Sequence, residues 1–206
     1  MDKRKEEAHR SWAKFINPEF LRGNLIAASI FLAAYETLRA SIIDRIQDFF
    51  TTGFDESGWI ISEDYKNKVL SLDKSPLRAS LLWLKEMSVI SDADIELVQA
   101  IREHRNELAH DLPKLIATAD ADININLLDS IYDLITKIDR WWIREVDLPT
   151  DPDFYGREVP DNDILSGNML FLQIMIRTAT DENASDLWEE FQLVGGIPKA
   201  DRLSIG

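Results

Sequence analysis

A long segment with helical periodicity, residues 24–50, constrains the fold of this chain more than any other feature. Asn24 is expected to cap the start of a helix here, and Thr51-Thr52-Gly53 to stop it. The apolar residues between these signals recur mostly three and four positions apart, the spacing that places side chains on one face of an α-helix: Ile26, Ile30, Phe31, Ala34, Leu38, Ile42, Ile46 and Phe49. The sequence therefore predicts a helical protein with this segment in its core.

Helical patterns cover most of the remaining chain. Ser75-Pro76 is a typical helix start, and Ser91 is expected to cap a helix that Pro113 ends within a turn. No run alternates with period two for long enough to require a sheet. The other helices are expected over residues 3–15, 62–72, 123–144, 164–177 and 182–193, with a loop at 146–163. The predicted fold class is all-α, an up-and-down bundle of four to five core helices with a helical C-terminal extension.

The charge distribution suggests how the chain is organised. We expect an N-terminal helix at residues 1–23, the helical bundle at 24–146, and an acidic loop with a helical extension at 147–206. The net charge is −14, and the part from Val146 onward carries four Lys or Arg against twelve Asp or Glu. A balance this acidic argues against a surface that binds nucleic acid over its whole area. Any anion site must be local.

The composition excludes several kinds of chemistry. The chain has no cysteine and three histidines, so disulfides and thiolate catalysis are ruled out, and the histidines lack a usual zinc spacing. We therefore expect no metal and no cofactor. The charged start of the chain does not resemble a signal peptide, and the longest apolar-rich run, residues 25–35, is shorter than the roughly 20 residues of a membrane span. The protein is expected to be soluble and cytoplasmic, without a membrane partner.

The stretch Arg105-Asn106-Glu107-Leu108-Ala109-His110 carries the functional prediction. A guanidinium binds a phosphate through a planar set of donors, and an imidazole accepts or donates a proton near neutral pH. Residues five apart are about 140° apart around an ideal helix, so Arg105 and His110 do not share a face of a straight helix. Either Pro113 distorts the last turn, or the two-fold axis of a homodimer brings two such pairs into one cleft.

This stretch matches the R-x4-6-H signature of the HEPN superfamily (higher eukaryotes and prokaryotes nucleotide-binding), with a polar residue directly after the arginine. Ala34-Tyr35-Glu36-Thr37-Leu38 also resembles the first core helix of that family, in which an acidic residue often recurs. The resemblance covers residues 24–144. Some toxin members carry a tyrosine two residues after the histidine, which a partner enzyme modifies. Leu112 stands there in this chain, which puts regulation by that route in doubt.

The resemblance implies metal-independent cleavage of RNA by a homodimer. Arg105 would stabilise the charge on the phosphate, His110 would act as general base or acid, and Asn106 would bind a phosphate oxygen or orient the imidazole. Arg102 and His104, close to Arg105 on the same helix, are candidates for contacts with the substrate. Such proteins often act as toxins or antiviral-defence effectors, with an antitoxin or another defence protein as partner.

The same residues have simpler interpretations. Arg105 could pair with Glu36, a polar organiser of the core, and hold two helices together. His110 near a helix C-terminus is favoured by the helix dipole without any catalysis. His104 is expected to be a solvated helix residue, and Arg102 could pair with Glu103 or Glu107. The alternative function is a catalytically inactive HEPN-like module that binds a protein partner, and the acidic extension could serve that partner or cover the RNA site.

Overall fold

The computed structural model describes residues 3–56, 58–118, 123–154 and 156–180. These residues form helices and one small sheet. The α-helices are α1 (Lys3–Ile16), α2 (Pro18–Phe49), α3 (Glu63–Tyr65), α4 (Pro76–Glu86), α5 (Asp92–Ala117), α6 (Asn126–Trp142), α7 (Leu148–Thr150) and α8 (Gly167–Thr180). Two π-helical segments, η1 (Lys66–Leu70) and η2 (Ile143–Asp147), continue α3 and α6, and two short 3₁₀ turns, η3 (Pro152–Phe154) and η4 (Asp161–Asp163), follow α7.

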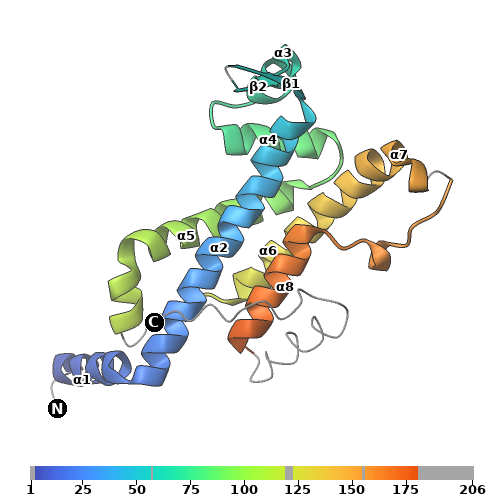
Figure 1. Ribbon diagram of the computed structural model, residues 1–206. Helices are drawn as coiled ribbons and strands as arrows, with labels where there is room; N and C mark the ends of the chain where they lie inside the picture. The colour runs from blue at the N-terminus through green and yellow to red at the C-terminus, as the bar shows by residue number, and fades with distance from the viewer. Residues whose placement is uncertain (1–2, 57, 119–122, 155, 181–206) are drawn as a thin grey trace.

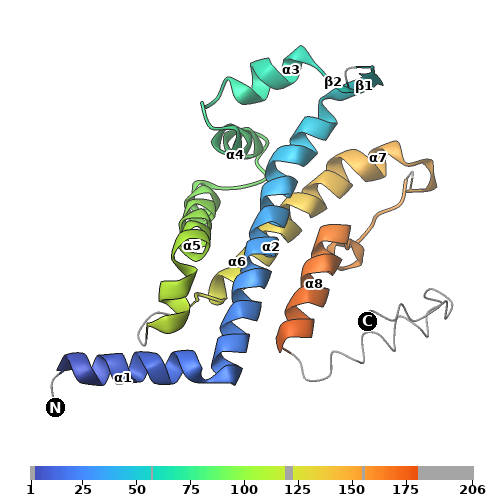
Figure 2. The ribbon, with the colours of Figure 1, turned by 60° about the vertical axis from the view of Figure 1, so that its left-hand side comes forward.

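Helix α2 is the centre of the fold. It packs against α4 and α5 on one side and against α6 and α8 on the other, and it runs between these helices in both views (Figures 1 and 2). Its buried residues follow the predicted apolar period and include Phe31, Ala34, Leu38, Ile42 and Ile46. The predicted central helix is therefore confirmed, because its apolar face has partners along most of its length.

The start of α2 differs from the prediction. The cap is Asn17, whose side-chain oxygen accepts hydrogen bonds from the backbone N–H groups of Glu19 at 3.1 Å and Phe20 at 3.3 Å. Pro18 occupies the first turn, where a missing N–H costs nothing. Asn24, the expected cap, lies inside the helix. The expectation was wrong because Asn17-Pro18, taken as the end of the first helix, also starts the second.

A two-stranded antiparallel sheet stands where only a loop was expected. Strand β1 (Thr51–Asp55) pairs with β2 (Gly58–Ile61), with a register shift between Thr51 and Gly53. The rings of Phe54 and Trp59, which are opposite each other, meet edge to face at 5.3 Å between centroids. Gly58 has a φ of +113°, a backbone conformation that favours glycine. The strands are too short for their alternation to be recognised in the sequence.

Helix α5 begins as predicted and ends differently. Ser91 and Asp94 form a capping box, in which each side chain accepts from the other residue's backbone N–H. Pro113 does not end the helix, which continues to Ala117 across a kink at Asp111, where φ is −117° and ψ is 17°. A proline inside a helix lacks a donor and clashes with the preceding turn, so it bends the helix here without stopping it.

Helix α8 is fixed to the core by a partly buried polar cluster. Asp139 Oδ2 accepts hydrogen bonds from Ser166 Oγ at 2.6 Å and Asn168 Nδ2 at 3.1 Å. Asn168 Nδ2 also lies 3.1 Å from Ser41 Oγ on α2. The expected loop at 146–163 includes short helical turns, and the helix expected at 182–193 lies outside the described residues.

By length and composition alone, α2 also passes a test for a membrane-spanning helix, with a mean hydropathy of 1.4 over the best window. Half of that window is buried inside the protein, and core helices of soluble proteins pass the same test. The packing of α2 in the fold accounts for the buried half of this window.

Candidate functional site

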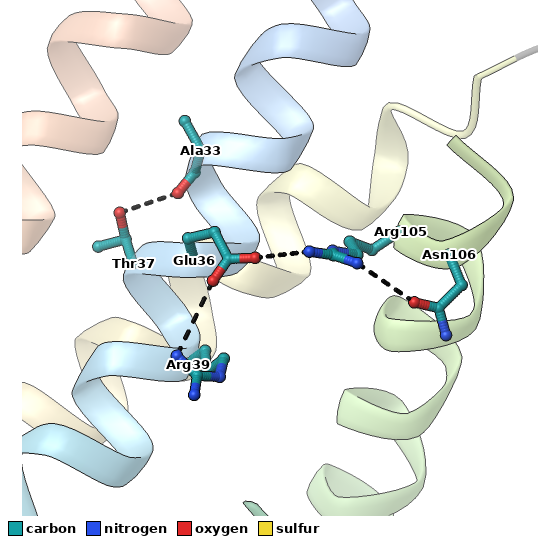
Figure 3. Close-up of polar contacts among 6 residues, drawn as sticks. All are labelled: Ala33, Glu36, Thr37, Arg39, Arg105 and Asn106. Carbon is teal, nitrogen blue, oxygen red and sulfur yellow. Dashed lines mark hydrogen bonds and ion pairs between the residues drawn. The ribbon is translucent and has the colours of Figure 1, made fainter. Parts of the chain in front are cut away.

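Arg105 projects from α5 toward α2 and is held there by Glu36. Its Nη2 donates a hydrogen bond to Glu36 Oε1 at 2.9 Å (Figure 3). Its guanidinium carbon lies 5.5 Å from the centre of the Tyr35 ring. The Arg105 side chain is 33% exposed and that of Glu36 49% exposed. The pairing that the sequence offered as a packing role is therefore present, and it leaves part of the guanidinium open to solvent.

Glu36 lies between two arginines. Its other oxygen, Oε2, is 4.0 Å from Arg39 Nη1, one turn further along α2 (Figure 3). The group Arg39, Glu36 and Arg105 thus carries two positive charges and one negative charge. Glu36 reduces the local positive charge but does not cancel it.

Asn106 follows Arg105 and contacts the same guanidinium. Its Oδ1 lies 3.5 Å from Arg105 Nη1, which is long for a hydrogen bond, and its side chain is only partly buried (Figure 3). Arg105 Nε is buried and has no hydrogen-bond partner among the described protein atoms. Since Nε is closed to solvent, the N–H groups available to an incoming anion are those on Nη1 and Nη2 that make no other contact.

His110 lies on the exposed side of α5, directly before the kink at Asp111. No hydrogen bond or ion pair joins its side chain to another residue in the described part of the chain. Because the kink begins after His110, the helical offset of about 140° from Arg105 still applies, and the two side chains lie about 7.5 Å apart along the axis. One chain alone therefore does not place both groups on one face.

His104 is buried, so the expectation of a solvated side chain was wrong. The residue is 8% exposed, and its ring meets Phe31 edge to face at 4.9 Å. Its Nε2 accepts the backbone N–H of Asn124 at 3.1 Å, which assigns the ring proton to Nδ1, 3.3 Å from Glu107 Oε2. These contacts join α5 to the segment before α6, and they leave little of the ring available to a substrate.

Arg102 is exposed and makes no ion pair with a described residue, its neighbours Glu103 and Glu107 included. It lines a small cavity of about 70 Å³ beside Ser75 and Arg78, at the junction of α4 and α5. Glu103 instead accepts from Gln99 at 2.8 Å. Arg102 therefore lies free at the surface but beside α4, and no contact brings it to Glu36.

Among the described residues, no cluster of three or more His, Asp or Glu side chains is arranged to hold a metal ion. The chemistry available around Arg105 consists of anion binding by the guanidinium and proton transfer by the His110 imidazole. Neither group needs a metal for these roles.

Three comparisons, with protein-family models, with curated proteins and with solved structures, found no match to this chain. The geometry of Arg105, Asn106 and His110 is therefore the basis for a functional assignment.

Sequence reasoning missed two polar groups that the fold brings together. One is the contact of His104 with Asn124, which depends on a main-chain donor and so has no side-chain signal. The other is the cluster of Ser41, Asp139, Ser166 and Asn168, whose members come from three separate parts of the chain. An aspartate on the apolar face of a predicted helix was the one available sign of this cluster, because a buried carboxylate needs donors.

Proposed function

We propose that this protein is a metal-independent endoribonuclease of the HEPN type that acts as a homodimer. The observation that carries the proposal is the guanidinium of Arg105, which Glu36 holds at 2.9 Å while further N–H groups on Nη1 and Nη2 stay uncommitted. An exposed His110, whose side chain has no partner among the described residues, lies on the same helix. The fold class, helical around a long central helix, is compatible with a HEPN-like bundle.

Arg105 would bind the phosphate and stabilise the charge that develops on it. The carboxylate of Glu36 restrains the long arginine side chain, so less conformational freedom is lost when RNA binds. Arg39 keeps the group positive overall, which favours an anionic substrate. Asn106, in contact with Arg105, would donate its amide to a second phosphate oxygen.

His110 would transfer the protons. As general base, an imidazole takes the proton of the ribose 2′-hydroxyl, and the 2′-oxygen then forms a bond to phosphorus while the bond to the 5′-oxygen breaks. A protonated imidazole gives its proton to the departing 5′-oxygen. The products would be a 2′,3′-cyclic phosphate and a 5′-hydroxyl. Two histidines, one from each protomer, would allow the base and the acid to act at the same phosphate.

The second protomer follows from the position of the two groups on α5. Because Arg105 and His110 point in different directions on one helix, a partner is needed to complete the cleft. Trp12 and Ile16 on α1 are 64% and 68% exposed, and α1 packs beside the end of α5, where Lys14 Nζ donates to the Thr118 carbonyl at 3.1 Å. This apolar surface next to the motif is our candidate dimer contact.

The cellular role we propose is that of a cytoplasmic toxin or antiviral-defence effector, held in check by an antitoxin or another defence protein. This role follows from the resemblance and from a chemistry that destroys RNA without a cofactor.

The decisive experiment incubates purified protein with RNA in the presence of a chelator. We expect fragments that end in 2′,3′-cyclic phosphate, and single-turnover rates reduced by about 10²-fold or more in Arg105→Ala and His110→Ala. Arg78→Ala is the matched control for loss of an arginine, since Arg78 lies on α4 and pairs with Asp73. The mechanism is excluded if the first two variants cleave as fast as the parent.

A second experiment tests the dimer contact. Trp12→Glu combined with Ile16→Lys puts charges on the apolar surface of α1, and we expect a monomer by light scattering and loss of cleavage. A variant that stays dimeric and active would place the contact elsewhere.

One observation favours a different function, an inactive module that binds a protein partner. Phe54 and Trp59, on the two paired strands of the hairpin, are 69% and 73% exposed, and their rings contact each other. Contiguous exposed aromatic surface is typical of protein contacts. This alternative is supported if the protein leaves RNA intact and binds the protein encoded by an adjacent gene. The substitution Trp59→Ser should then abolish that binding.

A further inference from the structure

A second cavity lies far from the Arg105 motif, between the C-terminal half of α6 and the turn that joins α4 to α5. Its volume is about 420 Å³, within the range of small-molecule sites. Ser88 and Val89 line it from the turn, Asp161 from η4, and the other lining residues come from the end of α6 and the segment that continues it.

Three cations on one face of the helix line this cavity, and one of them has no ion-pair partner within the described ranges. Lys137 Nζ donates to Asp94 Oδ2 at 2.6 Å, and Arg144 pairs with Asp161. Arg140, between them, forms no ion pair with any described residue. The residues three and four positions from Arg140 are Thr136, Lys137, Ile143 and Arg144, so the helix offers it no carboxylate at those spacings.

Two buried polar atoms of the lining residues lack hydrogen-bond partners. They are Nε of Arg140 and Oγ1 of Thr136, one turn before it on the same face. A threonine hydroxyl in a helix commonly donates to the carbonyl four residues earlier, as Thr37 does to Ala33 at 3.0 Å. Thr136 does not. Buried polar groups nearly always have a hydrogen-bond partner. Two donors without a partner, both on residues that line a cavity, therefore point to an acceptor that comes from outside the chain.

The cavity is separate from the proposed catalytic site. Asn124, which His104 contacts, precedes the start of α6 at Asn126, and Arg140 lies 14 residues further along that helix, a distance of about 21 Å. Exposed carboxylates of Asp133 and Glu145 also line the cavity. These charges disfavour a long polyanion such as an RNA strand, whereas a small ligand with one compact anionic group avoids them.

We propose that this cavity binds a small phosphate monoester, whose phosphate accepts hydrogen bonds from the guanidinium of Arg140 and the hydroxyl of Thr136. A guanidinium matches two oxygens of a phosphate at once, and the hydroxyls of Thr136 and Ser88 suit the remaining oxygens of a tetrahedral group. The half-buried Trp141 gives the cavity an apolar wall for the organic part of the ligand.

Calorimetric titration of the full chain tests this proposal, with inorganic phosphate, glycerol 1-phosphate and acetate as probes at matched ionic strength. We expect saturable binding of both phosphate compounds at millimolar concentrations or below, tighter for glycerol 1-phosphate, and much weaker binding of acetate. Arg140→Gln should weaken phosphate binding by about tenfold or more, and Thr136→Val by less.

Arg78→Gln removes the same charge at a distant surface site and should bind phosphate like the parent. Circular dichroism and thermal unfolding will verify that each variant is folded. Valine has nearly the same shape as threonine, so Thr136→Val should remove the hydroxyl without disturbing the fold. Cleavage of RNA should be unchanged in Arg140→Gln, so this test is independent of the proposed catalysis. Absence of saturable phosphate binding, equal binding of acetate, or full affinity in Arg140→Gln would each overturn the proposal.

Discussion

Arg105 Nη2 donates a hydrogen bond to Glu36 Oε1 at 2.9 Å and so joins the middle of α5 to the central helix α2. Both side chains are partly exposed, and exposed ion pairs contribute little to stability because water screens them. A pair that adds little stability yet fixes the orientation of a guanidinium is better explained by positioning than by packing.

Glu36→Gln tests this interpretation. We expect the free energy of unfolding to fall by less than about 1 kcal/mol, since the ion pair is partly solvated. Cleavage should fall by about tenfold or more, because Arg105 loses its restraint. Glu96→Gln, an exposed neutralisation on α5, is the control for net charge. Large destabilisation with unchanged cleavage would assign the pair to packing.

Truncation of the two histidines of α5 should change the stability of the protein by very different amounts. His104→Ala leaves the Asn124 N–H without its acceptor and opens a cavity against Phe31, so we expect a loss of about 2–4 kcal/mol in denaturant unfolding. His110→Ala removes an exposed side chain and should change stability by less than about 0.5 kcal/mol. Equal losses would contradict the assignment of His104 to the core.

Asp139 should control the attachment of α8. Asp139→Ala removes the acceptor shared by Ser166 and Asn168, and we expect a loss of about 2–3 kcal/mol with faster amide hydrogen exchange in α8. Asp133→Ala, an exposed change on the same helix, should leave exchange in α8 unaltered. Uniform acceleration across all helices would indicate global destabilisation instead.

Asp94 gives a prediction for acid pH. Burial by itself raises the pKa of Asp94, but hydrogen bonds from Lys137 and Ser91 outweigh it and hold this pKa below its ordinary value. The unfolded chain therefore binds a proton at Asp94 more readily than the folded chain. Its contribution to stability is present above a pH of about 3.9 and is lost as the pH falls through the folded-state pKa.

Asp94→Asn should cost about 1 kcal/mol near neutral pH, because it weakens the capping box and the contact with Lys137. The stability difference from the parent should shrink as the pH is lowered toward 3 in urea titrations. A difference independent of pH would show that the Asp94 charge makes no contribution.

Local signals in the sequence were sufficient to predict much of the helical structure. The spacing of apolar residues predicted the central helix, Ser91 and Ser75-Pro76 marked two helix starts, and Ser62 opened the helical segment α3–η1. These features depend on residues within a few positions of one another. Predictions from such local signals fail where one signal serves two elements, as at Asn17-Pro18. They also fail where an element is very short, as in the hairpin β1–β2.

The sequence by itself determined the helical character of the chain and the presence of Arg105, Asn106 and His110 on one helix. Only the tertiary structure decided which polar side chains of this helix have partners. Arg105 pairs with Glu36, and His104 is buried and contacts Asn124, while His110 is exposed to solvent. The physical reason is that helical periodicity is a local property, whereas a polar partner 69 positions away or a main-chain donor 20 positions away is supplied by packing.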